Sequence, residues 1–237
     1  NMKTFTLFAG LCLGTALSAS ATLYQFDYTS DFENSGNIPD GNVSPWSDTR
    51  TVSGITESSI SSVSVRLNMT GGYNGDLYAY LSYNNNRLVL LNRVGVGVGT
   101  DSEPTFTFGY AGEGFTGLVL QDGGAKGDIH TYGGGVGTGA YSADGRDVSP
   151  LASPATLYGT SRATFATTFG GMNPNGAWTL VFADMSAGGG QSHIVDWGLD
   201  ITAVPEPVNI ALGIFGGLWG VIRLARLLRR HEASRSQ

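Results

Sequence analysis

Hydrophobic and polar residues alternate along much of the chain, which is the pattern of a β-strand with one buried face. Residues 62–69 are the clearest case, because Val63, Val65, Leu67 and Met69 alternate with Ser, Arg and Asn. Between the two terminal segments no 3.6-residue periodicity is sustained, and no repeat of about 20 to 50 residues is found. Alternation, or short apolar runs bounded by turn residues, predicts strands at residues 22–28, 50–55, 63–69, 77–81, 88–91, 105–108, 117–120, 178–182 and 195–201.

Strands separated by frequent turn signals predict an all-β fold, and we expect an antiparallel β-sandwich of jelly-roll type over residues 22–203. Trp178 and Trp197 stand among alternating apolar residues, so both are expected in the core, with Val195 facing the same way as Trp197. Glycine is frequent at 36 residues, and it dominates residues 123–140, where no strand is predicted. Loops are expected at residues 34–48 and 94–100, and a polar excursion at 141–154.

The amino end has the pattern of a secretory signal peptide. Lys3 precedes an apolar run over residues 5–17, and Ala19-Ser20-Ala21 matches an A-x-A cleavage site. Residues 1–21 are therefore expected to pass the Sec translocon and to be removed by signal peptidase, so that the mature chain begins at Thr22. An uncleaved N-terminal anchor is the alternative. Cys12 is the single cysteine, so the mature chain would hold no disulfide.

The carboxyl end, residues 204–237, combines an apolar run with a basic cluster. The run covers residues 208–222, and as a helix it would reach roughly 22 Å at ~1.5 Å per residue, which is short for a hydrocarbon core of about 30 Å. Extension to a transmembrane helix over residues 208–228 closes the gap, because long arginine side chains can reach the headgroup layer. An amphipathic helix on a membrane or on the body is the alternative. The expected cytoplasmic end is marked by Arg223, Arg226, Arg229 and Arg230.

The tripeptide Pro205-Glu206-Pro207, followed by this helix and the basic cluster, resembles the PEP-CTERM sorting tail of Gram-negative bacteria. The resemblance implies recognition by an exosortase, a membrane transpeptidase-like protease that cuts near the tripeptide and removes the anchor. It also implies export, a transient stay in the inner membrane, and a final location at the cell surface or outside the cell.

The body has a second resemblance. Residues 61–67 leading to Gly75-Asp76-Leu77, and Gly176-Ala177-Trp178-Thr179-Leu180 leading to Asp184, resemble the P domain (P/Homo B) of proprotein convertases. That family implies a β-sandwich of jelly-roll type that usually accompanies a subtilisin-like protease. Met69-Thr70 stands where the family usually has His-Thr, and residues 92–169 fit poorly. Because no protease domain accompanies the module in this chain, a supporting role would concern a separate protease.

Charge is distributed unevenly along the chain. Residues 22–204 hold seven Lys or Arg and seventeen Asp or Glu, whereas residues 205–237 hold five basic and two acidic residues. An acidic, lysine-poor body repels phosphates, so nucleic acid is not an expected partner. The same charge is compatible with divalent cations or neutral glycans.

A calcium site is the metal site that the body could build, although no cofactor is required by any motif. The candidates are acids next to predicted turns, where a carboxylate could equally accept backbone N–H bonds. No EF-hand or nonapeptide spacing is present. The candidate ligands are Asp76, Asp122, Asp128, Asp144, Asp147 and Asp184.

Aromatic residues cluster early in the chain and suggest a glycan-binding surface. Tyr78 and Tyr80 are predicted on the strand face opposite Leu77, Ala79 and Leu81, and cross-strand packing is their alternative role. The further members of this cluster are Trp46, Tyr73 and Tyr83.

No catalytic motif is recognisable. The body holds two histidines, His130 and His193, but neither a Gly-x-Ser-x-Gly elbow nor a His-Glu-x-x-His run. Asp128 could orient the His130 ring, yet His130 is expected to be a surface or turn residue. We therefore expect a non-enzymatic surface or extracellular-matrix protein. The alternatives are a carbohydrate-binding module of the exopolysaccharide layer and an accessory domain for a separate protease.

Overall fold

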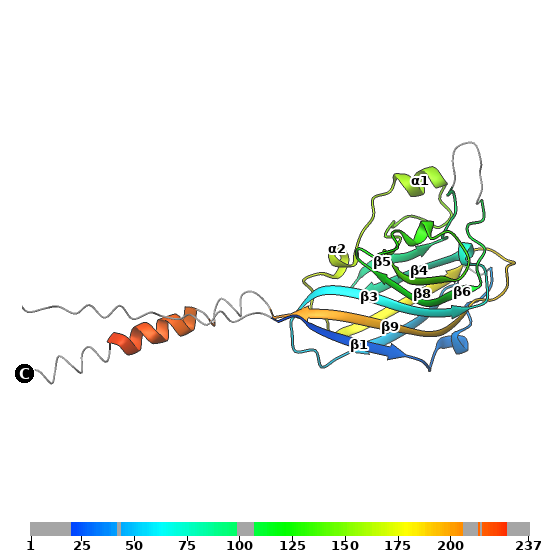
Figure 1. Ribbon diagram of the computed structural model, residues 1–237. Coiled ribbons are helices and arrows are strands. Elements are labelled where there is room, and N and C mark those ends of the chain that lie inside the picture. The colour runs from blue at the N-terminus through cyan, green and yellow to red at the C-terminus, as the bar shows by residue number, and fades with distance from the viewer. Residues whose placement is uncertain (1–19, 42–43, 99–106, 206–212, 214, 227–237) are drawn as a thin grey trace, which may run out of the picture. The chain divides into compact units, whose positions relative to one another are not determined.

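The computed structural model describes residues 20–41, 44–98, 107–205, 213 and 215–226. The chain divides into two compact units, the body Ala21–Val204 and a second unit of both chain ends. The body is built mostly of strands, which form two sheets (Figure 1). One has five strands, β1 (Thr22–Tyr28), β9 (His193–Val204), β3 (Ser59–Thr70), β6 (Gly114–Gln121) and β7 (Gly137–Tyr141), in that order. The other has four, β2 (Trp46–Val52), β8 (Gly176–Asp184), β4 (Leu77–Tyr83) and β5 (Asn86–Asn92).

Short helical elements lie in the connections between the strands. α2 (Phe165–Phe169) contacts both β3 and β5, so it bridges the two sheets. α2 is closed by a capping box between Thr164 and Thr167, and α1 (Pro154–Gly159) begins with a proline behind the capping residue Ser153. These helices are too short to leave a periodic pattern, and neither was predicted. Three single turns complete the set, η1 (Glu33–Gly36), η2 (Asn74–Asp76) and η3 (Ile129–Thr131).

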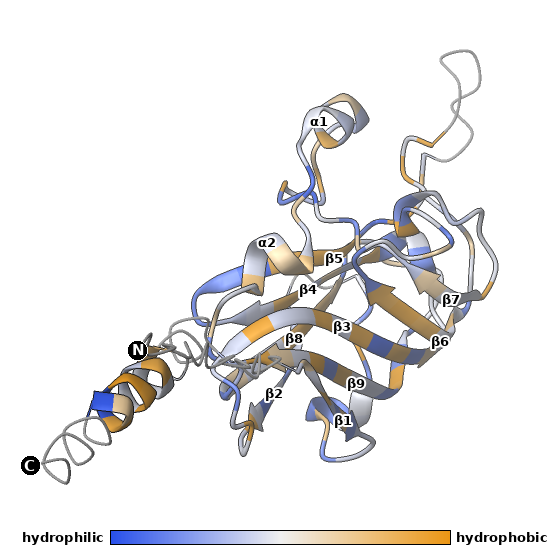
Figure 2. Ribbon diagram, turned by 60° about the vertical axis from the view of Figure 1, so that its left-hand side comes forward, coloured by the Kyte–Doolittle hydropathy of each residue, from blue (hydrophilic) through white to orange (hydrophobic). Residues whose placement is uncertain are grey.

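The alternating strands bury the predicted faces, and the inner residues of both sheets form one hydrophobic cluster (Figure 2). Trp178 and Trp197 are 0% and 1% exposed, which confirms the prediction that both lie in the core. Trp178 stacks on Tyr83 with ring centroids 4.0 Å apart. The indole Nε1 of Trp197 donates to Asp48 Oδ2 at 2.7 Å, which ties β9 to β2 in the other sheet.

Val195 does not face the core as predicted. Pairing of β9 with β3 shifts register at this point, from Asn68 opposite Asp196 to Met69 opposite Ile194. Val195 lies between these two pairs and has no residue of β3 opposite it. Its side chain is 43% exposed, and Ile194 is buried instead. One inserted residue reverses the faces of a strand, because side chains alternate with a period of two.

Two other strand predictions were wrong. Thr107 and Phe108 of the predicted strand 105–108 lie in a turn, while residues 105 and 106 are outside the described residues. The glycine-rich segment contains β7, which pairs in parallel with β6, so the sheets are mainly rather than wholly antiparallel. A Cβ at Gly137 would lie 2.6 Å from the Phe115 ring, so the missing side chain is what lets β7 approach β6.

The second unit is described only in part. Residues 215–226 are helical and mostly hydrophobic, with the Arg223 guanidinium 4.4 Å from the centre of the Trp219 ring (Figure 2). Among the described residues no helix is long and apolar enough to cross a membrane. Ala21, Pro205, Arg223 and Arg226 are described. The predicted signal and sorting residues that lie outside the described residues are Ala19, Glu206, Pro207, Arg229 and Arg230.

The start of β1 is held by an acidic side chain from the loop before β3. Thr22 Oγ1 donates to Glu57 Oε1 at 2.7 Å, and the Tyr24 hydroxyl donates to Glu57 Oε2 at 2.6 Å. The hydrogen bonds from Thr22 and then Tyr24 lower the pKa of Glu57 from 4.5 to about 2, because they favour the ionised carboxylate. The ionised form of Glu57 therefore adds to the attachment of the first residues of β1, which backbone pairing with β9 holds along its length.

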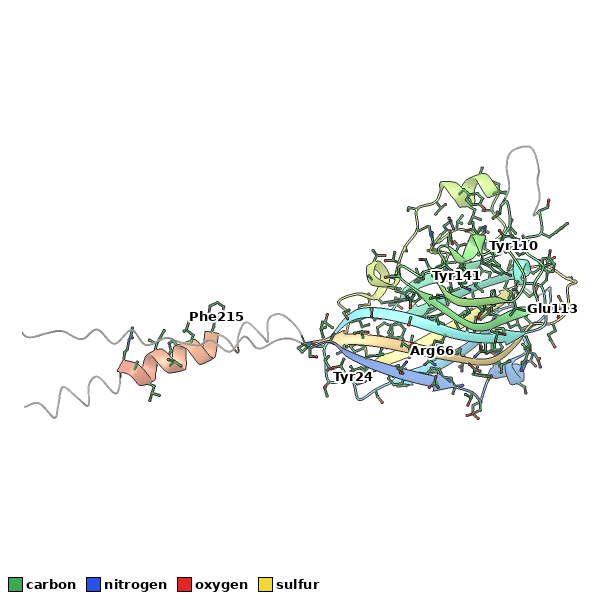
Figure 3. The ribbon with its side chains drawn as sticks, in the orientation of Figure 1. Tyr24, Arg66, Tyr110, Glu113, Tyr141 and Phe215 are labelled. Carbon is green, nitrogen blue, oxygen red and sulfur yellow. The ribbon has the colours of Figure 1, made fainter. Side chains whose placement is uncertain are left out.

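We expect acid to weaken this attachment. A carboxyl whose pKa is lower in the folded than in the unfolded protein stabilises the fold above its unfolded pKa and loses that effect as pH falls. In thermal melts between pH 4.5 and about 2, the melting temperature of Glu57→Gln should therefore fall less steeply than that of the wild type. Glu113→Gln is the control, since Figure 3 places Glu113 at the end of the body opposite Tyr24. Parallel curves for wild type and Glu57→Gln would contradict the role of Glu57.

Candidate functional site

Two buried carboxyl groups meet where β4 begins and β8 ends. Asp76 closes η2 directly before β4, and Asp184 is the last residue of β8. The two strands pair antiparallel with Leu77 opposite Asp184, so the acids become neighbours although they are far apart in sequence. Asp76 is 5% exposed and Asp184 1%, which is unusual for acidic side chains.

The hydrogen bonds of this acid pair are incomplete. Asp184 Oδ1 accepts from the Ser186 backbone N–H at 3.1 Å, but among the described residues Asp184 Oδ2 has no hydrogen-bond partner. The nearest cation is Arg93, whose Nη2 lies 3.8 Å from Asp76 Oδ1. Burial, and next the Asp184 charge, raise the pKa of Asp76 to about 6 against the opposing effect of Arg93. Burial also raises the pKa of Asp184, against backbone hydrogen bonds from Ser186 and Gly41 that lower it, and the charge of nearby Asp40 raises the pKa of both acids further.

The other predicted calcium ligands have separate structural roles. Asp122 caps α2 by accepting from the backbone N–H groups of Phe165 and Ala166, each at 2.8 Å. Asp147 forms a surface ion pair with Arg87 at 2.7 Å. Within the described part of the chain no three His, Cys, Asp or Glu side chains gather closely enough to hold a metal ion by themselves. The structure therefore brings Asp76 and Asp184 together at one place, and Asp128 and Asp144 at another.

The cluster that holds Asp128 and Asp144 surrounds His130, which was expected to be a surface or turn residue. His130 does lie in a turn, η3, but it is fully buried and not at the surface. His130 Nδ1 lies 2.9 Å from Asp144 Oδ2, and Nε2 lies 3.1 Å from the Val96 carbonyl oxygen. Asp128 does not orient the ring, because its Oδ1 accepts from the His130 backbone N–H at 3.0 Å. Asp144 takes that role, and sequence reasoning missed it because the acid lies fourteen residues further along.

Two arginines complete the cluster. Arg146 donates from its backbone N–H and from Nη1 to Asp144 Oδ1, at 3.2 and 3.3 Å. The guanidinium groups of Arg146 and Arg162 both reach Asp128 Oδ2, at 3.0 and 3.1 Å. The Asp128-Ile-His and Asp144-Gly-Arg stretches are the signal that could have found this network. Both ring nitrogens of His130 face oxygen acceptors inside the protein, so neither is available to take a proton from a substrate.

The aromatic cluster divides between core and surface. Trp46 and Tyr83 are buried, and the Tyr73 hydroxyl donates to the Gly109 carbonyl at 3.2 Å. Tyr78 and Tyr80 alone point outward from the four-stranded sheet, half-buried, with ring centroids 6.0 Å apart.

Their surroundings combine an apolar floor with a charged rim. Tyr80 stands between Val89 and Val181 of the neighbouring strands, and both valines are buried. The Arg87 guanidinium lies 5.8 Å from the centre of the Tyr80 ring and pairs with Asp147 beside it. The tyrosines thus cover apolar residues of their own sheet while leaving part of each ring accessible.

Comparison with known proteins assigns no family to this chain. No family model matches the sequence, and no curated protein matches it. Solved structures with a weak likeness to it include the serine protease of Aeromonas sobria and the complex of that protease with the chaperone ORF2. For the complex the TM-score is 0.42 and for the protease alone 0.41, each at 14% identity. These likenesses cover 80% and 78% of this chain but 28% and 27% of the other, and at this level they identify neither a family nor a function.

The His130 cluster should contribute strongly to stability. Replacing His130 by Ala leaves the buried Asp144 carboxyl group without one of its hydrogen-bond partners, and a buried polar group that loses its partner costs about 1–3 kcal/mol, more when the group is charged. Arg87→Ala removes one partner of an exposed pair and should cost about 1 kcal/mol or less. Urea unfolding of wild type and both variants measures the difference. A cost for His130→Ala no larger than that of Arg87→Ala would show that the cluster is not a structural anchor.

Proposed function

We propose that this is a non-enzymatic protein of the cell surface or extracellular matrix, exported through the Sec translocon and processed by an exosortase at Pro205-Glu206-Pro207. One observation carries the proposal. The compact body extends over Ala21–Val204, and these limits coincide with the predicted signal cleavage site and the sorting tripeptide. Both expected cuts thus fall outside the folded core, where processing leaves the core intact.

The pairing of the first and last strands supports the same reading. Thr22 lies opposite Ala203, so both ends of the body leave the five-stranded sheet at one point. Glu57 fixes Thr22 and Tyr24 there independently of the residues that precede them. The helical, mostly hydrophobic residues 215–226 fit the predicted anchor of a chain that would be held in the inner membrane of a Gram-negative bacterium until release.

We assign the body to the jelly-roll type of sandwich. Successive strands pass from one sheet to the other at every connection except β4 to β5 and β6 to β7. This repeated crossing is the way in which jelly rolls and Greek keys place distant strands side by side.

Processing is tested by mass spectrometry of the protein recovered from the surface of its host. We expect an N-terminal peptide that begins at Thr22 and a C-terminal peptide that ends near Pro205. In a strain without the exosortase, the C-terminal peptide should extend beyond Arg230. A mature surface pool that retains the tail in the presence of exosortase would overturn the proposal.

The same limits predict that the body is stable alone. A fragment of residues 22–204 should melt within a few degrees of the full chain, because β1 and β9 retain all their partners. A fragment that ends at residue 198 removes half of β9 and should fail to fold, since Leu199 and Ile201 belong to the core. Differential scanning calorimetry compares the three proteins, and a large loss in the 22–204 fragment would place the boundary elsewhere.

A second candidate function is binding of exopolysaccharide, and the outward position of Tyr78 and Tyr80 favours it. Partly exposed rings beside Arg87 and Asp147 offer a stacking surface and hydrogen-bonding groups for a sugar. On a glycan array and in subsequent titrations, Tyr78→Ala and Tyr80→Ala should each weaken binding about tenfold, the equivalent of ~1.4 kcal/mol. Phe108→Ala is the control, since Phe108 is an exposed aromatic residue in a different loop. Equal binding by all variants would exclude this surface.

A further inference from the structure

The unpartnered oxygen of Asp184 requires a physical explanation. Buried polar atoms are almost always hydrogen-bonded, and an exception points to strain, to function or to an ion. Asp184 is 1% exposed, and its Oδ2 has no hydrogen-bond partner among the described residues, so the protein itself does not compensate for the burial of this oxygen. The neighbouring Asp76 carboxylate makes the position less favourable still, because two like charges repel each other there.

The charge around the pair remains unbalanced. Asp40 raises the pKa of both Asp76 and Asp184 by its negative charge, so three carboxylates share this end of the body. Among the described residues, Arg93 is the cation that opposes this negative charge, and its Nη2 stands 3.8 Å from Asp76 Oδ1. When all three carboxyl groups are ionised, two negative charges are left without compensation, which equals the charge of one divalent cation.

Glycine residues let the surrounding loops pack closely on the carboxylates. A Cβ at Gly189 would lie 2.7 Å from Tyr73 Cβ and 3.5 Å from Asp76 Oδ2, so a side chain there would collide beside this carboxylate. Gly41 packs directly on Ala187, which draws the loop of Asp40 against the connection between β8 and β9. The loop of Asp40, the turn that ends at Asp76 and the end of β8 at Asp184 thus lie close together.

We propose that Asp76 and Asp184 form the carboxylate part of a divalent-cation site, with Asp40 as a third acid beside it and Ca²⁺ as the cation. Oxygen is the donor element on each of the three side chains, which selects a hard cation over zinc or copper. Because no third acidic side chain closes the site, carbonyl and water oxygens supply the remaining ligands. Calcium accepts six to eight oxygens in flexible geometry, whereas magnesium requires a strict octahedron.

Binding at this position would fasten three segments of the body to one another. The cation links the loop of Asp40, the turn before β4 and the end of β8, which sequence separates widely. Extracellular calcium modules work at dissociation constants of about 10⁻⁴–10⁻³ M, so a site with few carboxylates suits an exported protein. The proposal is independent of sorting and of glycan binding, and its failure would leave both untouched.

Thermal melting of the purified protein tests the proposal. With CaCl₂ at about a hundredfold excess over the dissociation constant, the melting temperature should rise by roughly 5–10 °C over that in EGTA. The same concentration of MgCl₂ should produce a smaller rise. No rise with calcium would overturn the site, and an equal or larger rise with magnesium would overturn its assignment to calcium.

Variants of single acidic residues show whether the calcium-dependent rise in melting temperature arises at Asp76 and Asp184. Asp184→Asn and Asp76→Asn should each abolish the calcium-dependent rise, while Asp147→Asn should retain it, because Asp147 lies in the exposed pair with Arg87. Isothermal titration of the wild type with CaCl₂ should give one site per chain, which keeps the proposal testable if a variant does not fold. A calcium-dependent rise that persists in both Asp76→Asn and Asp184→Asn, or a titration without binding, would refute it.

Discussion

The position of β9 between β1 and β3 is the constraint on which the rest of the body depends. β9 pairs with β3 along nearly its whole length and with β1 from Trp197 to Ala203, and it carries Trp197, Leu199 and Ile201 into the core. Through the bond from Trp197 to Asp48 it is also tied to the four-stranded sheet. β9 therefore joins β1 to the rest of the five-stranded sheet. This explains why the compact body extends as far as Val204 and does not end before β9.

Two clusters of buried polar side chains in the body differ in how completely their members are paired. Around His130, arginine, carboxylate and carbonyl groups satisfy one another, so the network is suited to fixing the connections β5–β6, β6–β7 and β7–β8, which supply its members. At Asp76 and Asp184 the compensation is incomplete, since like charges are buried together with one oxygen left without a partner. A network whose hydrogen bonds are complete stabilises a single conformation, whereas an incomplete one favours the binding of a ligand that supplies the missing charge.

The strands were predictable wherever one face is buried and turn residues mark the ends, as in β3, β4 and β8. β7 was not, because its approach to Phe115 depends on glycine and leaves no alternating pattern. Val195 was misplaced because an inserted residue cannot be seen without the partner strand. The two sites could not be predicted for the same reason. The neighbours of His130 and the pairing of Asp76 with Asp184 depend on strand register and loop packing, and the periodicity of a single segment contains no information on either.

The position of β7 affects how readily two copies of the protein associate through their sheet edges. It forms one border of the five-stranded sheet, and its five residues include two glycines. A long, flat border strand invites a second chain to add its own strand, whereas a brief one with weak β-propensity is a poor template. This border of the sheet is therefore protected from the addition of a strand by a second copy of the chain.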